Sequence, residues 1–382
     1  MTVNGGITRG GPDDGAGRIS WGLAAVIALV LLAAGGFVVT RLIGLDRPSE
    51  PGAAPTPAAT SASPSPTPTP TPEPGADIKG PLNLLLVGVD TRVSDPGWEP
   101  HADAVLIMHI TAALDRAYLF SLPRDLIVDI PPFEKANFRG DRSKLTHAMS
   151  YGSRRPGRTG RPSAEQGLQL LSATVRDYTG IERFDAAAVL TFGAFDDLVD
   201  ALGGVDLYID QRVVSQHRRP DGRHRAPGNG GYVGPQMVYE KGMRHLNGWQ
   251  ALDYARQRYI AGGDYSRQRH QQQLIKALVG KIVDQDMARD PDRIDAVLRA
   301  MGDAMIFEGG DQQVIDFAFA LSGLRPENIT LVSLPGSSVT SGGSYRGERL
   351  HQIATPFLKA VREDTVDAFL ADNPDLVVPD RG

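Results

Sequence analysis

The stretch LFSLPRDLIVDIP, residues 119–131, places an arginine and an aspartate directly after an apolar run. Residues 116–122 are predicted to form a buried strand, and Pro123 ends it because proline has no N–H to give to a sheet ladder. Arg124 and Asp125 therefore follow the carboxyl end of a strand. Ligands of open α/β sheets bind at such ends, although a charged pair here can also be a solvated turn.

The composition limits the classes of function. The chain has 382 residues, enough for a substantial core and for two domains by length alone. Its formal net charge is −5, from 40 Lys+Arg against 45 Asp+Glu, so the composition does not predict nucleic-acid binding. The sequence contains no cysteine, which excludes disulfides, thiolate metal sites and a cysteine nucleophile.

Three segments precede the globular part. Residues 1–20 are polar and glycine-rich, which predicts a disordered cytoplasmic tail. Within residues 21–43, the uncharged stretch WGLAAVIALVLLAAGGFVV predicts a retained transmembrane helix rather than a cleaved signal peptide. Residues 44–80 form a Pro/Thr/Ser-rich linker that favours polyproline II. This plan predicts a single-pass protein of the cell membrane, with the N-terminus in the cytoplasm and the globular domain outside it.

Residues 81–382 alternate predicted strands and helices. Strands are predicted at Leu82–Asp90, 103–110, 116–122, 184–191, Val205–Ile209 and 329–334. Helices are predicted from a capping box at Ser163 to Gly180, and at 195–202, 249–255, 264–284, 291–302, 312–321 and 350–362. Residues 133–161 and 213–234 and a Gly/Ser stretch after 334 are predicted to be loops. The alternation predicts one α/β domain, layered helix–sheet–helix.

Three acidic residues lie at the ends of the first buried strands. Asp90 ends the first, Asp103 begins the second, and Asp125 follows the third. If the first two strands are antiparallel, Asp90 and Asp103 come together at one edge. Mg²⁺ needs only one or two carboxylates besides water and phosphate oxygens, so this pair is a candidate metal site. The alternative is that each aspartate only caps a loop.

The stretch DYARQRYIAGGDYSRQRHQQ, residues 253–272, concentrates arginines. Arg256 and Arg258 are two positions apart, so in a helix they would point well apart around the axis. They converge only if the helix unwinds near Ala255. Gly262 and Gly263 indicate that the chain turns soon afterwards.

A second helix is predicted to begin after that turn, with Asp264 as its N-cap and Arg267 in its first turn. Arginines in a first turn are disfavoured by the helix dipole, so stability alone does not explain them. Several guanidinium groups together suit a pyrophosphate. Arg124 and Lys144 are predicted to complete the group.

A set of motifs then occurs in an order typical of one family. They are LLVGVDTR, HADAVLIMHI, SLPRDLIVDIP, KLTHA, LVDALGGVDL, LNGWQALDYARQRY and GGDYSRQRHQQQL. Together, over about residues 81–283, they resemble the LytR-CpsA-Psr family of cell-wall proteins.

That resemblance implies an α/β/α sandwich around a mixed β-sheet, anchored by one N-terminal span. It implies a phosphotransferase that moves a glycopolymer, teichoic acid or another, from a polyprenyl-pyrophosphate carrier onto peptidoglycan, using Mg²⁺ or Mn²⁺. By motif, the implied metal-side acids are Asp90 and Asp103. The implied catalytic residues are Asp103, Arg124, Asp125, Arg256 and Arg258, and the implied pyrophosphate ligands are Arg124, Lys144, Arg256, Arg258, Arg267 and Gln271.

Two other functions stay open from the residues. One is hydrolysis of the carrier-linked pyrophosphate, and the other is binding or regulation without turnover. His101 stands where the family usually has the arginine of Arg-x-Asp, and His270 where it usually has the second arginine of Arg-x-x-Arg-Gln. Histidine titrates near neutrality, which predicts a weaker or pH-dependent grip on phosphate.

The lipid half of such a substrate needs an apolar tunnel. Candidates to line it are residues 186–190 together with Leu198, Val199, Leu274, Ile275 and Leu278. Each of them, taken singly, is assigned more simply to an ordinary hydrophobic core.

Overall fold

The computed structural model describes residues 75–90, 97–158, 160–228, 231–284 and 305–379. The predicted tail, the predicted span and most of the predicted linker lie outside these residues, as does the predicted helix at 291–302. Within the described ranges, no helix has both the length and the apolar character needed to cross a bilayer.

A six-stranded mixed sheet forms the centre of the domain. Its strand order is β13 (Met305–Glu308), β6 (Ala186–Thr191), β1 (Leu82–Asp90), β2 (His101–Ile110), β3 (Ala117–Leu122) and β14 (Ile329–Val332). The β1–β6 and β3–β14 pairs are parallel, and the other neighbours are antiparallel. The predicted mixed sheet is therefore confirmed, and β3 stops before Pro123 as expected.

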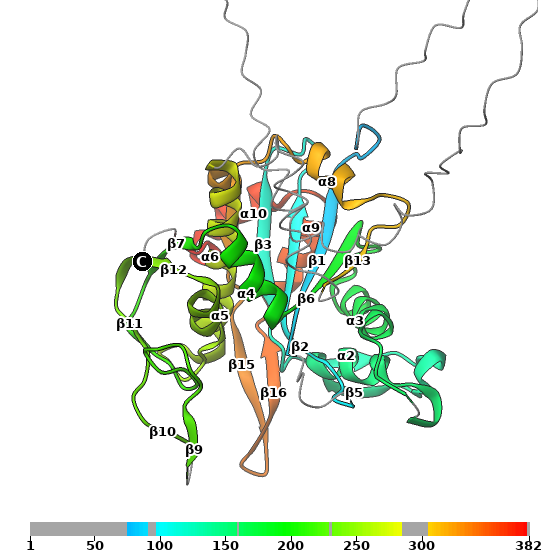
Figure 1. The fold of residues 1–382 in the computed structure, drawn as a ribbon. Coiled ribbons are helices and arrows are strands. Elements are labelled where there is room, and N and C mark those ends of the chain that lie inside the picture. Colours follow the sequence, from blue (N-terminus) through cyan, green and yellow to red (C-terminus); the bar gives the residue numbers. More distant parts are fainter. Residues whose placement is uncertain (1–74, 91–96, 159, 229–230, 285–304, 380–382) are drawn as a thin grey trace, which may run out of the picture.

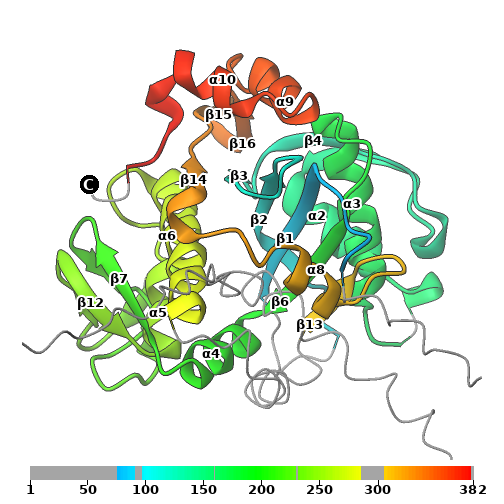
Figure 2. The same ribbon diagram turned by 90° about the horizontal axis from the view of Figure 1, so that it is seen from above.

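Helices cover both faces of this sheet (Figure 2). Leu84 and Leu86 of β1 belong to one apolar cluster, and Leu85 and Val87 to another, as the alternation of a strand requires. The first cluster includes residues of α4 (Phe192–Ala201), α5 (Gly248–Arg256), α6 (Gly263–Asp284) and α8 (Val314–Ala320). The second includes residues of α2 (Leu145–Ser153), α3 (Ala164–Thr179), α9 (Ala354–Arg362) and α10 (Val366–Asp372).

The prediction of a loop at 133–161 is wrong. The segment contains the 3₁₀ turn η2 (Glu134–Ala136), strand β5 (Asp141–Lys144), which pairs with β4 (Ile127–Ile130), helix α2 and the 3₁₀ turn η3 (Pro156–Arg158). Buried Leu145, Ala148, Met149 and Gly152 share one face of α2. Half of this stripe consists of small residues between arginine- and glycine-rich stretches, so its helical period is weak.

The loop predicted at 213–234 is also partly wrong. Beside the pair β7 (Val205–Ile209) and β12 (Gly242–Leu246), it contributes β8 (Val213–Val214), which pairs with β11 (Val238–Tyr239), and the hairpin β9 (Ala226–Gly228)–β10 (Gly231–Val233). The predicted Gly/Ser loop is the hairpin β15 (Gly336–Ser341)–β16 (Ser344–Leu350). Strands this short, or this polar, show no alternation of buried residues to detect.

The predicted helix signals mostly hold. Ser163 Oγ accepts from the Gln166 N–H at 3.2 Å, and Gly180 closes α3 at φ 72°. The capping box there is incomplete, because the Gln166 side chain bonds carbonyls of Gly152 and Arg154 instead. The other helices predicted within the described residues are present with ends shifted by a few residues. The remaining described 3₁₀ turns are η6 (Pro326–Asn328) and η7 (Pro374–Leu376).

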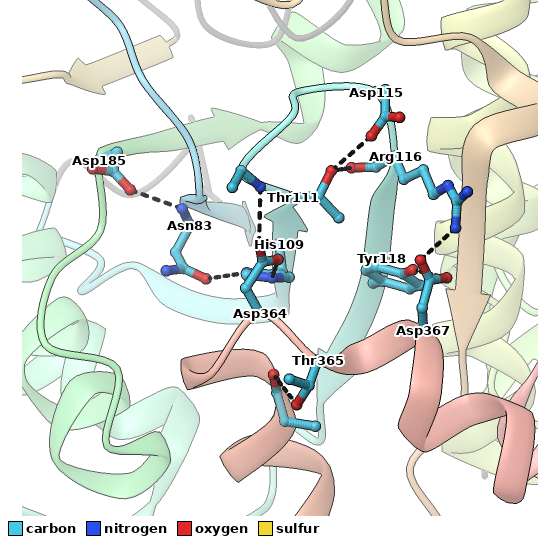
Figure 3. A network of polar contacts seen from close by, with 12 residues as sticks. Asn83, His109, Thr111, Asp115, Arg116, Tyr118, Asp185, Asp364, Thr365 and Asp367 are labelled. Carbon is cyan, nitrogen blue, oxygen red and sulfur yellow. Dashed lines mark hydrogen bonds and ion pairs between the residues drawn. The ribbon is translucent and has the colours of Figure 1, made fainter.

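A buried polar network joins the C-terminal helices to the sheet (Figure 3). His109 of β2 is fully buried, and its ring nitrogens lie 3.0 Å from Asn83 Oδ1 and 3.0 Å from Asp364 Oδ1. Asp364 lies between α9 and α10, and Tyr118 of β3 donates to Asp367 of α10. These bonds fix α9 and α10 against the strands.

Candidate active site

A β-bulge shapes the edge of the sheet where β1 ends and β2 begins. Asp90 pairs with His101, Val89 with Ala102 and Gly88 with Ala104, so Asp103 is an extra residue on β2. Such a bulge re-aims a side chain and is common beside active sites. The antiparallel pairing places Asp90 and Asp103 at the same edge. The strand itself begins at His101, two residues before the predicted start.

Arg124 contacts Asp103 from the loop after β3. Its Nη1 donates to Asp103 Oδ1, and its Nε lies 3.8 Å from Asp125 Oδ1. Lys144 Nζ is 3.1 Å from the same Asp125 oxygen. The backbone N–H of Thr146 donates to the Arg124 carbonyl at 2.9 Å, which ties α2 to this loop. Asp125 is thus a shared counterion that holds two cations beside Asp103.

Helix α5 ends at Arg256, so Arg256 and Arg258 are not both held in helical geometry. Asn247 and Gln250 form a complete capping box at its start, and Gln257 after its end is extended at ψ 124°. Arg256 Nη2 lies 3.3 Å from Asp90 Oδ2. The predicted unwinding near Ala255 is present one residue later.

Arg258 and Arg267 interact electrostatically with the same charged groups of the site. Arg267 is only 5% exposed, and its Nη2 contacts Asp264 Oδ1 at 2.8 Å. Burial lowers the pKa of the Arg267 guanidinium, while the negative charges of Asp264 and Asp103 oppose the shift and nearby Arg124 and Arg258 reinforce it. Asp264 is not the predicted N-cap but the second residue of α6. The structure thus brings Arg124, Arg258 and Arg267 near Asp103.

An apolar cavity of about 90 Å³ opens beside Arg256. It lies between the sheet and helices α4, α5 and α6, and is lined by Leu86, Val87, Gly88, Ala104, Leu106, Ala188, Leu190, Phe195, Leu252, Ala255, Arg256, Gln271, Leu274 and Ile275. Of the predicted tunnel residues, Ala188, Leu190, Leu274 and Ile275 line it. Ala186, Leu198, Val199 and Leu278 are core residues on the same side, and Ala187 and Val189 face the other cluster.

A sequence model described as the LytR_cpsA_psr family matches residues 55–363 of the chain. The chain belongs to this family. One relative is biofilm regulatory protein A of Streptococcus mutans, 26% identical over 274 residues, which are 70% of this chain and 59% of the relative. Another is the polyisoprenyl-teichoic acid–peptidoglycan teichoic acid transferase TagU of Bacillus cereus, 27% identical over 202 residues, 53% of this chain and 52% of TagU. The chain therefore spans between about half and three fifths of these relatives' lengths.

Solved structures show the same LytR-CpsA-Psr fold. B. subtilis TagV matches with a TM-score of 0.54 at 18% identity, over 76% of this chain and 98% of TagV. Protein gbs0355 of Streptococcus agalactiae matches with a TM-score of 0.55 at 22% identity, over 75% of this chain and 87% of that protein.

The two departures from the LytR-CpsA-Psr pattern have different surroundings. His270 is fully buried, stacks on Tyr254 and has Nε2 2.9 Å from Asp210 Oδ1. Arg269 also binds Asp210, at 2.6 Å. Burial alone would raise the pKa of Asp210, but these two partners outweigh it and lower that pKa to about 2. Neither His270 nor Arg269 joins the arginine group, so the prediction that His270 tunes the phosphate grip does not fit its position. His101 lies at the site edge, opposite Asp90.

Gln271 and Asp253 stabilise the end of α5, the segment that carries Arg256 and precedes Arg258. Gln271 Nε2 donates to the Ala255 carbonyl at 3.4 Å, so it joins the end of α5 to α6. Asp253, one turn before the end of α5, is 4% exposed. Its Oδ1 accepts from Ser215 Oγ at 3.0 Å and from Gln257 Nε2 at 2.8 Å, and its Oδ2 from Tyr239 O–H at 2.9 Å.

The sequence reasoning missed this supporting network. Asp253 is predicted only as the first residue of the arginine-rich stretch; its partner Ser215 lies in the predicted loop 213–234, and no prediction covers its partner Tyr239. An aspartate on the buried side of a helix is the one signal that points to partners there, because buried carboxylates need them.

The residue types at the sheet edge fit a divalent cation. Asp90 and Asp103 are carboxylates, and Mg²⁺ takes one or two of these together with phosphate oxygens and water. Each is paired with an arginine in the structure. The described residues hold no group of three or more His, Cys, Asp or Glu side chains suited to a metal. A cation here would therefore depend on the substrate for further ligands.

Proposed function

We propose that the chain is a membrane-anchored, extracytoplasmic phosphotransferase that attaches a polyprenyl-pyrophosphate-linked glycopolymer to peptidoglycan. One observation carries the proposal: Arg256 lines the apolar cavity and pairs with Asp90, at the sheet edge where Arg124 holds Asp103. A cavity for an apolar tail beside a group of guanidiniums suits a lipid diphosphate. The name of TagU, a polyisoprenyl-teichoic acid–peptidoglycan transferase, supports the same donor and acceptor classes.

In the proposed reaction, a hydroxyl of a peptidoglycan sugar attacks the phosphorus proximal to the glycan. A new P–O bond forms to that hydroxyl oxygen, and the P–O bond to polyprenyl phosphate breaks, so polyprenyl phosphate leaves. In the alternative in which one of the two carboxylates does not bind a cation, that group, Asp103 or Asp90, accepts the hydroxyl proton. Arg124, Arg256 and Arg258 stabilise charge that develops on the phosphate oxygens, with Lys144 and Arg267 adding to the field.

Asp90 and Asp103 would hold the Mg²⁺ or Mn²⁺ that we propose as cofactor, which would neutralise phosphate charge when bound. The arginines act whether or not the cation is present. Arg124 in particular is preorganised, because Asp103 and Asp125 both contact it in the structure.

The test is transfer by the purified full chain in detergent, with a polyprenyl-pyrophosphate glycan donor and peptidoglycan. Arg124→Ala and Arg256→Ala should lower transfer about 100-fold or more, as removal of one preorganised donor does. Arg142→Ala is the matched control, because Arg142 also pairs with an aspartate at 3.0 Å but lies exposed on β5. Normal transfer by the first two variants would contradict the proposal.

The same assay separates the rival functions. Release of polyprenyl phosphate at equal rates with and without peptidoglycan would identify a hydrolase instead. Tight donor binding with no product under either condition would identify a binding or regulatory protein.

A further inference from the structure

Five rings form a continuous row beside the arginine group. Successive ring centroids are 5.8 Å apart for Trp98 and His101, 6.0 Å for His101 and His147, 5.5 Å for His147 and Tyr151, and 4.9 Å for Tyr151 and Phe138. All five side chains are partly exposed. These residues are called the ring row below.

The ring row passes beside the reaction centre at His101. His101 is the register partner of Asp90. Lys144, whose ammonium binds Asp125, is the N-cap residue of the helix α2 that carries His147. Burial lowers the pKa of His147, and the nearby charges of Lys144 and Arg124 lower it further while Asp125 opposes them, which agrees with this proximity. Figure 1 shows α2 and β5 beside the start of β2.

The ring row and the apolar cavity lie on opposite faces of the sheet. Helix α2 packs with the cluster on one face of the sheet, whereas the cavity is lined by α5 and α6 on the other. The arginine group lies at the sheet edge between them. A lipid in the cavity therefore leaves the ring row open to a different part of the substrates.

Hydrogen bonds hold the rings in place. His101 Nδ1 is 2.9 Å from the Glu99 carbonyl, and His147 Nδ1 is 2.8 Å from Ser143 Oγ. Arg154 grips the Glu99 carboxylate with two bonds, of 2.8 and 2.9 Å. A surface fixed in advance loses less conformational entropy when a ligand binds.

Phe138 and Tyr151 pack against the second apolar cluster, whereas Trp98 belongs to neither cluster. A pyranose ring has an apolar C–H face that stacks on aromatic rings and a rim of hydroxyls that hydrogen-bonds to polar ring edges, such as those of Tyr and His. We propose that the ring row is a saccharide-binding surface for the peptidoglycan chain that accepts the glycopolymer at the arginine group. This assignment rests on the proposed function, in which the donor lipid takes the cavity on the other face of the sheet.

Direct binding tests the surface without any transfer. The full chain in detergent should bind a peptidoglycan tetrasaccharide of N-acetylglucosamine and N-acetylmuramic acid, measured by calorimetry. Trp98→Leu and Tyr151→Leu should each weaken binding about five- to tenfold, as expected for loss of one aromatic stacking partner. Tyr151→Phe keeps the ring and should bind within about twofold of the parent.

Tyr232→Leu is the matched control, because this 47%-exposed tyrosine also contacts a histidine, His217 at 5.1 Å, but on β10. Unchanged affinity in both ring-row leucine variants, each folded by circular dichroism, would overturn the proposal. An equal loss in Tyr232→Leu would overturn it too.

Transfer kinetics then test the assignment to the acceptor. Trp98→Leu should raise KM for peptidoglycan and leave KM for the donor unchanged, and the reverse result would overturn the proposal. Unchanged KM values for both would contradict any role of the ring row in the reaction. Arg256→Ala should abolish transfer yet keep tetrasaccharide binding, so failure of the proposed function and failure of the saccharide surface give different results.

Discussion

Asp253 supplies the sharpest test of how the site is supported. Its carboxyl group is buried and accepts from three donors, which belong to Ser215, Gln257 and Tyr239. Burial, together with the charge of Asp253, raises the pKa of the Tyr239 hydroxyl, so this group stays protonated as a donor. Two substitutions of Asp253 distinguish the contribution of its hydrogen bonds to stability from that of its charge.

Asp253→Ala removes both carboxylate acceptors and leaves the buried hydroxyls of Ser215 and Tyr239 without this partner, whereas Gln257 Nε2 keeps the Asp253 carbonyl at 2.8 Å. At about 1–3 kcal/mol for each unsatisfied group, less the desolvation that the carboxylate no longer pays, the expected loss is about 2–4 kcal/mol of unfolding free energy. Asp253→Asn keeps one oxygen for Ser215 and Gln257, and the Tyr239 hydroxyl can turn to accept from the new amide. The expected loss is then about 1 kcal/mol.

Urea unfolding of the full chain in detergent, followed by the fluorescence of Trp249 on α5, measures both values. Because Asp253 also holds Gln257, the residue between the two arginines, transfer should fall about tenfold in the alanine variant and much less in the asparagine variant. A loss below about 1 kcal/mol in Asp253→Ala, or equal losses in the two variants, would refute the reasoning.

Three further outcomes are expected. Burial lowers the pKa of His109 below its usual 6.5, so the folded state keeps the ring neutral. The free energy of unfolding should therefore fall as pH drops below about 6.5. The urea midpoint should change less with pH in His109→Gln than in the parent. Gly180→Ala should cost about 1–2 kcal/mol in thermal unfolding, because φ is +72° and the new Cβ would lie 3.1 Å from the Arg362 guanidinium; unchanged stability would contradict the αL cap. Ala104→Leu narrows the cavity, and should raise KM for long-chain donors while leaving a short-chain, water-soluble donor unaffected; equal effects on both would argue against the cavity as the lipid site.

The parts of the fold that local sequence determines could be predicted. The near-continuous apolar runs of β1, β2 and β3 indicated strands covered on both faces, and helices on both sides of the sheet confirm this. The spacing of Arg256 and Arg258 required a break in α5, and the helix ends at Arg256.

Features that depend on tertiary pairing could not be predicted. The bulge at Asp103 arises from the register of β1 against β2, which no single strand encodes. His270 was compared with an arginine by its position in a motif, but its partner Asp210 lies 60 residues earlier in the chain. Helix α2 and the β15–β16 hairpin lack a strong periodic apolar pattern, because small residues make up half of the buried stripe of α2 and most residues of the hairpin are exposed.

Strand order has a consequence for biosynthesis. Both outer strands of the sheet, β13 and β14, come from residues after 304, and they cover β6 and β3 respectively. A nascent chain that has not yet reached residue 305 therefore presents two unpaired strand edges, each able to pair with another molecule. Ribosome stalling or truncation just before residue 305 would yield aggregation-prone fragments even though every residue of the arginine group had been made.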